Sequence, residues 1–359
     1  MLLPADSSWL IPLNYLDLCF GVYLFLVISG FVITGSILES TRRSAAPRKA
    51  LMFSFWIKRI FRLLPAAWTW VIIACALQLL IVNITNIYYP LTDILRSTAA
   101  ALINVMNLYT PHCVANGGGQ SCIVDNFLGH YWSLSLEEQF YLIFPLLFFF
   151  LGRKWLITLL VAALLAQFMW HRPFFAYAWY FKTDALCWGI LLALLANTDF
   201  YQRHRPGLFR FRYLAASTGL ALLALLPLVA ANIQGLATGM KPYGVAVVAL
   251  ICAVIVWLAS YDKNVFALGG RYRRTLLYLG SRSYSLYLSH LVVYLGTRAL
   301  LGYFGQDLAS TIGGAAFNLL HILIAVSLTL LGAELTYRFV ETVLRAKGRA
   351  IASRQLLAA

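Results

Sequence analysis

Long runs of apolar residues alternate along the chain with short polar segments, most of which are basic. Nine of these runs approach the roughly 20 residues that a helix needs to cross a bilayer. They predict spanning helices at about 18–38, 64–83, 132–151, 155–170, 176–196, 213–232, 243–260, 279–301 and 312–333. A shorter run at 93–109 contains Arg96, Asn104 and Asn107, so we expect a re-entrant or interfacial helix there.

Composition supports this pattern. Of the 359 residues, 61% are hydrophobic and only 11% are charged, whereas soluble domains have about 25% charged residues. So few charges cannot cover the surface of a soluble fold of this length. The sequence therefore predicts an all-α integral membrane protein, a polytopic helical bundle. We expect one membrane domain over 1–345, followed by a basic cytoplasmic tail at 346–359.

The positive charges are distributed unevenly between alternate loops. The formal net charge is +15, and 23 of the 28 Lys and Arg residues lie in segments that the nine spans place on one side. Such a bias puts these segments and the C-terminus in the cytoplasm and the 84–131 loop outside. It also excludes a nucleic-acid surface, which needs basic residues gathered on one soluble face. Residues 1–14 then lie outside without a signal peptide, which predicts that a preceding span is missing.

Two arginines at the start of the second run are the first candidates for a binding role. Arg59 and Arg62 are three residues apart and share one face of a helix, and Pro65 fits the first turn of the span or a kink near it. Paired guanidinium groups bind phosphate groups bidentately. The alternative is that both charges only anchor the helix to lipid headgroups.

Acidic residues stand at the outer starts of two other runs. Glu137 and Glu138 follow Ser133 in the third run, and Asp184 opens the fifth. A carboxylate in the first turn of a helix can simply stabilise that turn. Because charges inside a membrane are costly, a functional role is the other interpretation. Such a carboxylate can orient or deprotonate a sugar hydroxyl.

Two further positions have both a structural and a functional interpretation. The small pair Ser29 and Gly30 in the first run allows either close helix packing or a narrow passage for a thin ligand. His290, about two turns into the eighth run, is either a hydrogen-bonded structural residue or a base.

Cys113 and Cys122 share a polar, glycine-rich loop that the charge bias places outside, which favours a disulfide. A zinc site with His112 and His130 is the alternative, but the spacing matches no standard zinc pattern. The other four cysteines lie in apolar runs and are expected to be core residues: Cys19, Cys75, Cys187 and Cys252.

Five segments occur in an order that resembles the membrane acyltransferase-3 family, which O-acylates bacterial surface sugars. They are GVYLFLVISGFVI at 21–33, the Arg59, Arg62 and Pro65 element, YWSLSLEEQFY at 131–141, TDALCWG at 183–189 and LGSRSYSLYLSH at 279–290. The resemblance implies a ten-span core in the bacterial cytoplasmic (inner) membrane. It also implies transfer of an acyl group, normally acetyl, from cytoplasmic acetyl-CoA or another acyl-CoA to a glycan hydroxyl outside. The acceptor would be a lipid-linked sugar, a lipopolysaccharide or an exopolysaccharide.

The resemblance also assigns residues. It places Arg59 and Arg62 near the CoA phosphates and the acyl chain beside Ser29 and Gly30, and it implies no metal. Four residues become catalytic candidates: Trp132, Ser133, Glu137 and Asp184. Four more are secondary candidates: Glu138, Tyr141, Tyr284 and His290.

One departure from the family pattern leaves alternatives open. The family's first span ends with a His, the expected general base, and that helix would precede Met1. We therefore expect either a misassigned start or a truncated, catalytically degenerate chain. A glycolipid transporter or flippase is a further alternative. It needs polar groups near the bilayer midplane and often an inverted repeat, neither of which the sequence displays.

Overall fold

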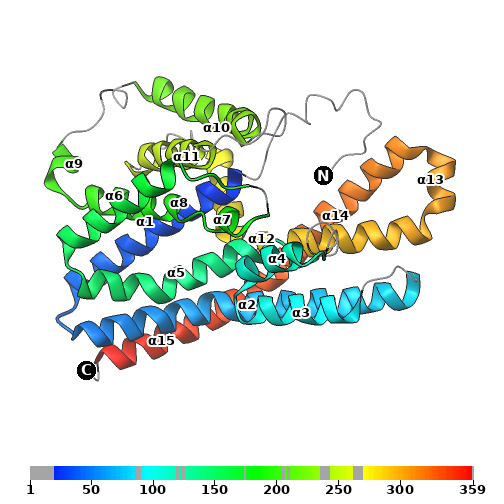
Figure 1. Cartoon of the computed structure of the whole chain (residues 1–359), viewed down its shortest axis with the longest axis horizontal. Helices are drawn as coiled ribbons and strands as arrows, with labels where there is room; N and C mark the ends of the chain where they lie inside the picture. Colours follow the sequence, from blue (N-terminus) through cyan, green and yellow to red (C-terminus); the bar gives the residue numbers. More distant parts are fainter. Residues whose placement is uncertain are drawn as a thin grey trace. The chain divides into compact units, whose positions relative to one another are not determined.

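The computed structural model describes residues 20–85, 90–118, 122, 126–173, 175–203, 207, 211–234, 243–261 and 270–357. All regular elements in this part of the chain are helices (Figure 1), which confirms the all-α membrane class. Six helices there are long and apolar enough to cross a membrane: Phe20–Arg43, Arg48–Ile84, Tyr131–Phe150, Tyr177–Ala196, Tyr213–Ala230 and Gly314–Leu357. Gly244–Ser260 is apolar but shorter. The count of nine spans stays a prediction.

The described residues form two compact units, each assembled from segments that are far apart in the sequence. The first unit comprises 46–142 and 278–357, and the second comprises 20–45 and 143–277. Helices α5 (Tyr131–Phe150) and α12 (Gly270–Phe304) each contribute residues to both units.

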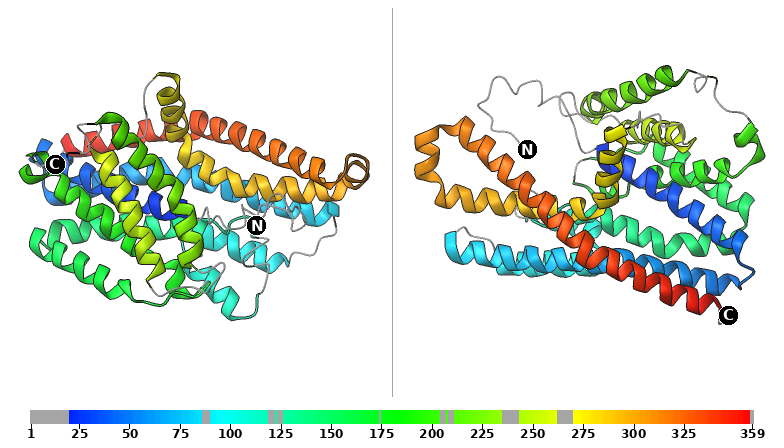
Figure 2. Two further views of the ribbon diagram at one scale, coloured as in Figure 1. Left: turned by 90° about the horizontal axis from the view of Figure 1, so that it is seen from above. Right: turned by 180° about the vertical axis from the view of Figure 1, so that it is seen from behind.

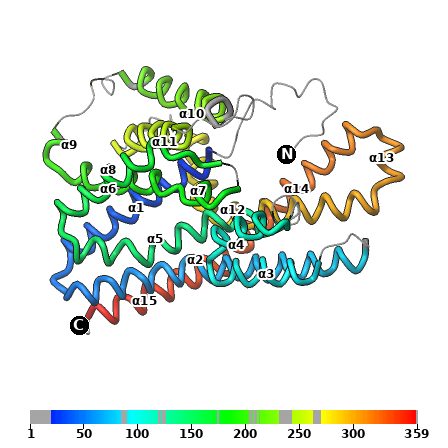
Figure 3. The backbone as a smooth tube through the Cα atoms, viewed as in Figure 1, coloured from blue at the N-terminus to red at the C-terminus, as the bar shows by residue number. Residues whose placement is uncertain are grey.

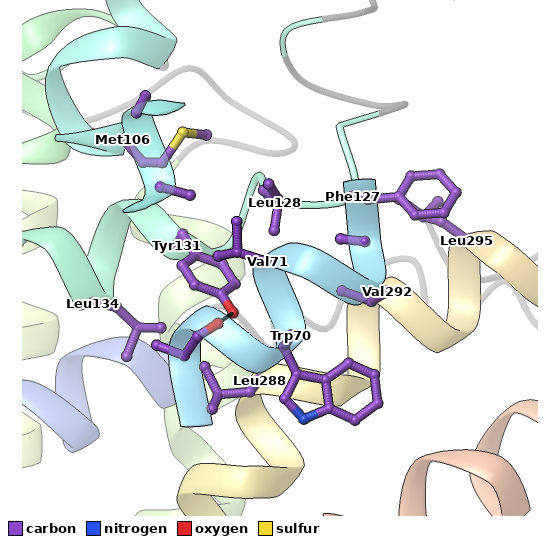
Figure 4. Close-up of a cluster of buried hydrophobic side chains, with 14 of the residues drawn as sticks. Trp70, Val71, Met106, Phe127, Leu128, Tyr131, Leu134, Leu288, Val292 and Leu295 are labelled. Carbon is purple, nitrogen blue, oxygen red and sulfur yellow. Dashed lines mark hydrogen bonds between the residues drawn. The ribbon is translucent and has the colours of Figure 1, made fainter. Parts of the chain in front are cut away.

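In the first unit, α2 (Arg48–Thr85) packs against α3 (Leu91–Leu102) and α15 (Thr342–Leu357). Helix α15 lies along the basic half of α2, which Figure 2 shows from two sides. The unit also contains α4 (Met106–Ala115), α13 (Gln306–Ile312), α14 (Gly314–Thr336) and the π-helical turn η4 (Tyr337–Glu341). Side chains from α2, α5 and α12 form its apolar core, among them Val71, Tyr131 and Leu288 (Figure 4).

The second unit is built around α1 (Phe20–Arg43) and α8 (Thr183–Ala196), which lie side by side (Figure 3). Gly30 and Gly189 allow this approach, because a Cβ on Gly30 would lie 2.5 Å from the Leu186 carbonyl oxygen. Gly30 therefore has the helix-packing role that the sequence offered as one interpretation, and an acyl chain beside Ser29 and Gly30 stays a prediction. The other helices are α6 (Arg153–Phe168), α7 (Tyr177–Tyr180), α9 (Asp199–Arg203), α10 (Arg212–Gln234) and α11 (Gly244–Ser260).

Several element boundaries differ from the prediction. The basic segment before residue 64 was expected as a loop, but α2 begins at Arg48, because that segment is rich in helix formers and packs against α15. Pro65 therefore lies inside α2. The predicted basic tail forms α15 as far as Leu357. The predicted exterior segment at the N-terminus and Cys19 lie outside the described residues.

The expected helix at 93–109 is split into α3 and α4. Asn104 has a φ of 55°, a left-handed conformation that ends a helix. The side chain of Gln139 in α5 donates to the Asn104 carbonyl oxygen at 3.0 Å and also bonds the Asn107 side chain. Gln139 of α5 thus satisfies the Asn107 side chain and the backbone carbonyl of Asn104.

The disulfide between Cys113 and Cys122 is confirmed, with their Cα atoms 6.1 Å apart. Both sulfurs are therefore unavailable as zinc ligands. Cys187 and Cys252 are buried as expected, whereas Cys75 is only partly buried. Within the described ranges, no three His, Cys, Asp or Glu residues are grouped so that they could hold a metal ion.

Candidate active site

Arg59 lies between aromatic rings where α2 meets α5. Its guanidinium carbon is 5.4 Å from the ring centroids of both Phe55 and Tyr141. The indole N–H of Trp56 donates to the carbonyl oxygen of Tyr141 at 3.0 Å. The sequence places Phe55 and Trp56 one turn before Arg59, so a single helical face supplies both the cation and its support.

Two carboxylates of α5 accompany Arg59. Glu137 is 3% exposed and accepts a hydrogen bond from the hydroxyl of Tyr141, one turn later on the same helix. Arg59 interacts electrostatically with Glu137 and Glu138. Successive helical residues point about 100° apart, yet both carboxylates lie within range of one guanidinium. The arginine expected at the inner face and the acid expected at the outer face therefore form one cluster.

The register of α2 and α5 explains this meeting. The hydroxyl of Tyr131 donates to the carbonyl oxygen of Ala67 at 2.9 Å, and Tyr141 lies opposite Trp56. The two helices therefore run antiparallel. Glu137 lies about 9 Å from the start of α5, at a helical rise of about 1.5 Å per residue. Ionisable groups this far inside spanning helices mark functional sites by default.

Tyr284 of α12 joins the same cluster. Its hydroxyl donates to the carbonyl oxygen of Leu63 in α2 at 2.9 Å, and it interacts electrostatically with Glu137 and Glu138. Trp132 is partly buried and packs against the apolar core. Of the secondary candidates, Glu138 and Tyr141 thus interact with Arg59, and Tyr284 interacts with Glu137 and Glu138.

A second polar group surrounds Ser133, one turn before Glu137. The hydroxyls of Ser133 and Tyr287 are 2.6 Å apart, and the Tyr287 hydroxyl also donates to the carbonyl oxygen of His130 at 3.0 Å. The ring centroids of His130 and His290 are 5.0 Å apart. The predicted site residues Ser133 and His290 therefore meet through His130 and Tyr287, which the sequence did not mark as site residues.

His130 carries a nitrogen that can accept a proton. Its Nε2 lies 3.2 Å from the carbonyl oxygen of Leu288, which fixes the hydrogen on that nitrogen. Its Nδ1 is buried and has no hydrogen-bond partner in the described part of the chain. Burial and the nearby His290 lower the pKa of His130, so the ring is neutral. In the sequence, Tyr284, Tyr287 and His290 are spaced three residues apart and so share one helical face. This spacing could have marked Tyr287 as a neighbour of His290, but it could not have revealed His130.

Asp184 and Ser29 belong to the second unit. Asp184 is 1% exposed, lies 3.3 Å from the guanidinium of Arg172 and accepts the backbone N–H of Ala185 at 3.1 Å. Lys182 is buried, with its ammonium nitrogen 3.0 Å from the ring centroid of Trp179. Arg172 and Lys182 are thus both interior groups. Ser29 is buried on α1.

Comparison with known proteins identifies the family. The acyltransferase-3 family model, described as an acyltransferase domain, matches residues 2–338. O-acetyltransferase OatA of Staphylococcus aureus strain NCTC 8325 / PS 47 is 28% identical over 347 residues, which cover 91% of this chain and 53% of the relative. A putative O-acetyltransferase of S. aureus strain COL is 27% identical over 354 residues with the same coverage.

The chain spans about half the length of the curated relatives it matches. No solved structure matches it. Because the family model covers nearly the whole chain, the chain belongs to the acyltransferase-3 family.

Proposed function

We propose that this chain transfers an acetyl group from cytoplasmic acetyl-CoA to a hydroxyl of a surface or lipid-linked glycan on the outer side of the bacterial cytoplasmic membrane. The observation that carries the proposal is the cluster in which the partly buried Arg59 lies beside the buried side chains of Glu137 and Tyr141. Membership of an acyltransferase family supports the reaction type. The names of the relatives support acetyl as the group and oxygen as the acceptor atom.

In this proposal Glu137 orients and deprotonates the acceptor hydroxyl. The hydroxyl oxygen attacks the thioester carbonyl carbon, so that a C–O bond forms and the C–S bond breaks. The proton passes from the hydroxyl to Glu137 and then to the leaving thiolate, which departs as CoA. Arg59 attracts Glu137 electrostatically and so holds the carboxylate beside α2. Tyr141 fixes the direction of the carboxylate.

The experiment that tests the function follows labelled acetyl groups. Inside-out membrane vesicles containing the chain receive acetyl-CoA labelled in its acetyl group, and we expect label in glycan that mild alkali releases as acetate. Right-side-out vesicles should incorporate none, because acetyl-CoA added outside cannot reach a cytoplasmic donor site. Incorporation no greater than in vesicles without the chain would contradict the proposal.

A glycolipid transporter would also place charged groups inside its spanning helices, as Arg59 and Glu137 are placed. The same vesicles separate the two functions. Movement of a fluorescent glycolipid across the bilayer, without alkali-labile label, would favour the transporter.

Tyr141→Phe tests how the carboxylate is held. The variant keeps the ring that supports Arg59 but removes the hydroxyl that donates to Glu137. Losing a hydrogen bond to a charged group should lower acetyl transfer about ten-fold. The measurement is the initial rate of label transfer, with equal amounts of folded protein. Phe140→Leu, at the neighbouring position on α5, is the matched control, and an equal loss in both variants would show that the hydroxyl has no specific role.

A further inference from the structure

Ion pairs leave an excess of positive charge where α2, α12 and α15 approach one another in the first unit. Glu334 accepts a hydrogen bond from Arg282 at 2.9 Å and is also paired with Arg338. Arg282 is further held between rings, with its guanidinium carbon 4.0 Å from the Tyr278 centroid and 4.2 Å from the Tyr337 centroid. Arg282 and Arg338 therefore both have Glu334 as an ion-pair partner.

The second carboxylate, that of Glu341, is also shared between two arginines. Glu341 is 2% exposed and accepts the hydroxyl of Ser285 at 3.1 Å. The guanidinium of Arg345 is 3.7 Å away, at the long end of an ion pair, and Arg62 lies within electrostatic range. Glu341, like Glu334, thus serves two guanidinium groups, which leaves one positive charge in excess at each carboxylate.

Both guanidinium groups also have unused hydrogen-bond donors. The Nε atoms of Arg62 and Arg345 are buried and have no partner among the described residues. A buried N–H without a partner is unfavourable, whereas an anionic oxygen at that place would satisfy it. Arg59 differs, because it interacts electrostatically with two carboxylates of α5. The two arginines of the Arg59 and Arg62 element therefore have different neighbours and different tasks.

Helix α15 is held firmly enough to contribute a binding group. A Cβ on Gly348 would lie 2.4 Å from the Cβ of Phe61, and Ala352 is completely buried. Phe61 adjoins Arg62, so the backbone of α15 lies directly against the stretch of α2 that carries that arginine. Helix α15 follows the residues that the family model matches, which end at 338.

We propose that Arg345 of α15 and Arg62 of α2 together bind a phosphate group of the CoA donor. Guanidinium pairs match phosphate oxygens in both charge and geometry. The inference rests on the proposed function in taking CoA as the donor. A lipid headgroup carries the same phosphate chemistry, so the experiment must separate the two sources.

The test measures CoA binding by titration calorimetry to the full chain in nanodiscs of neutral phosphatidylcholine. Arg345→Gln should weaken CoA binding about ten-fold or more, as should Arg62→Gln. Arg345→Lys keeps the charge but loses the planar guanidinium group. Its affinity for CoA should therefore lie between those of the unchanged chain and Arg345→Gln. Arg349→Gln removes the same charge from an exposed position of α15 and should bind CoA like the unchanged chain.

Two further measurements distinguish binding of a CoA phosphate from binding of a lipid headgroup. S-acetylpantetheine lacks the phosphates, and its binding should not depend on Arg345. In nanodiscs containing phosphatidylglycerol, CoA should still bind more weakly to Arg345→Gln than to the unchanged chain.

The failures of the two proposals can be told apart. Normal CoA binding by a folded Arg345→Gln chain would overturn this inference and leave the proposed function intact. An Arg345→Gln effect seen only on phosphatidylglycerol association would also overturn it, in favour of a headgroup site. An unchanged chain that binds no CoA at all would overturn both.

Discussion

Replacing Gly189 with leucine should prevent the second unit from folding. A Cβ at this position would lie 2.2 Å from the carbonyl oxygen of Val27 and 2.8 Å from the backbone nitrogen of Phe31. Both atoms belong to the backbone of α1 and cannot rotate away, so α1 and α8 would have to separate. Overpacking that only displaces side chains costs typically 1–3 kcal/mol, and a displaced helix costs more.

The measurement is size-exclusion chromatography of a fluorescent fusion after mild detergent extraction. Gly35→Leu is the matched control, because it lies on α1 with nothing within 4 Å of its added Cβ. We expect a monodisperse peak for Gly35→Leu and aggregated or absent protein for Gly189→Leu. A monodisperse Gly189→Leu peak with an unchanged melting temperature would contradict the close contact of α1 with α8.

Glu137→Gln should reduce acetyl transfer by about 100-fold or more. The amide has nearly the same shape but can neither take the proton of the acceptor nor balance the charge of Arg59. Removing one partner of a buried charge pair costs about 3–5 kcal/mol of stability. We expect part of this free energy to be lost from the stabilisation of the transition state. The assay is the initial rate of alkali-labile label in inside-out vesicles.

Glu39→Gln provides the control, because Glu39 forms an exposed ion pair with Arg43 on α1. It should transfer acetyl groups at the normal rate. Binding of CoA by Glu137→Gln should remain measurable, since the proposed phosphate pair lies on Arg62 and Arg345. A rate for folded Glu137→Gln within about three-fold of the unchanged chain would remove Glu137 from the mechanism.

The sequence predicted the helical membrane class, and it named several residues of the candidate cluster, because both depend on local patterns. Apolar runs define spanning helices, and charges inside such runs are rare enough to stand out. Arg59, Arg62 and Glu137 were found in this way. The Cys113–Cys122 disulfide was found because both residues share one short polar loop.

The grouping of these residues could not be predicted from local patterns. Loop charges assign a side of the membrane to each helix end, but they do not fix how far one helix slides along another. The offset between α2 and α5 places Arg59 opposite Tyr141 and brings Glu137 near Arg59. His130 was missed as a site residue for the same reason, since its neighbours Tyr287 and His290 are more than 150 residues away in the chain. The role of Gly30 was open until its partner Gly189 was known.

The ordering of these helices in the sequence has a consequence for biogenesis. Helix α2 leaves the ribosome with Arg59 and Arg62 long before the carboxylates that face them, because Glu137 lies on α5 and Glu341 lies on η4, which follows α14. Glu137 can approach Arg59 only after α5 has been made, and Glu341 can approach Arg62 only after α14 has been made. The surroundings of the second helix are thus completed by nearly the last residues to be synthesised.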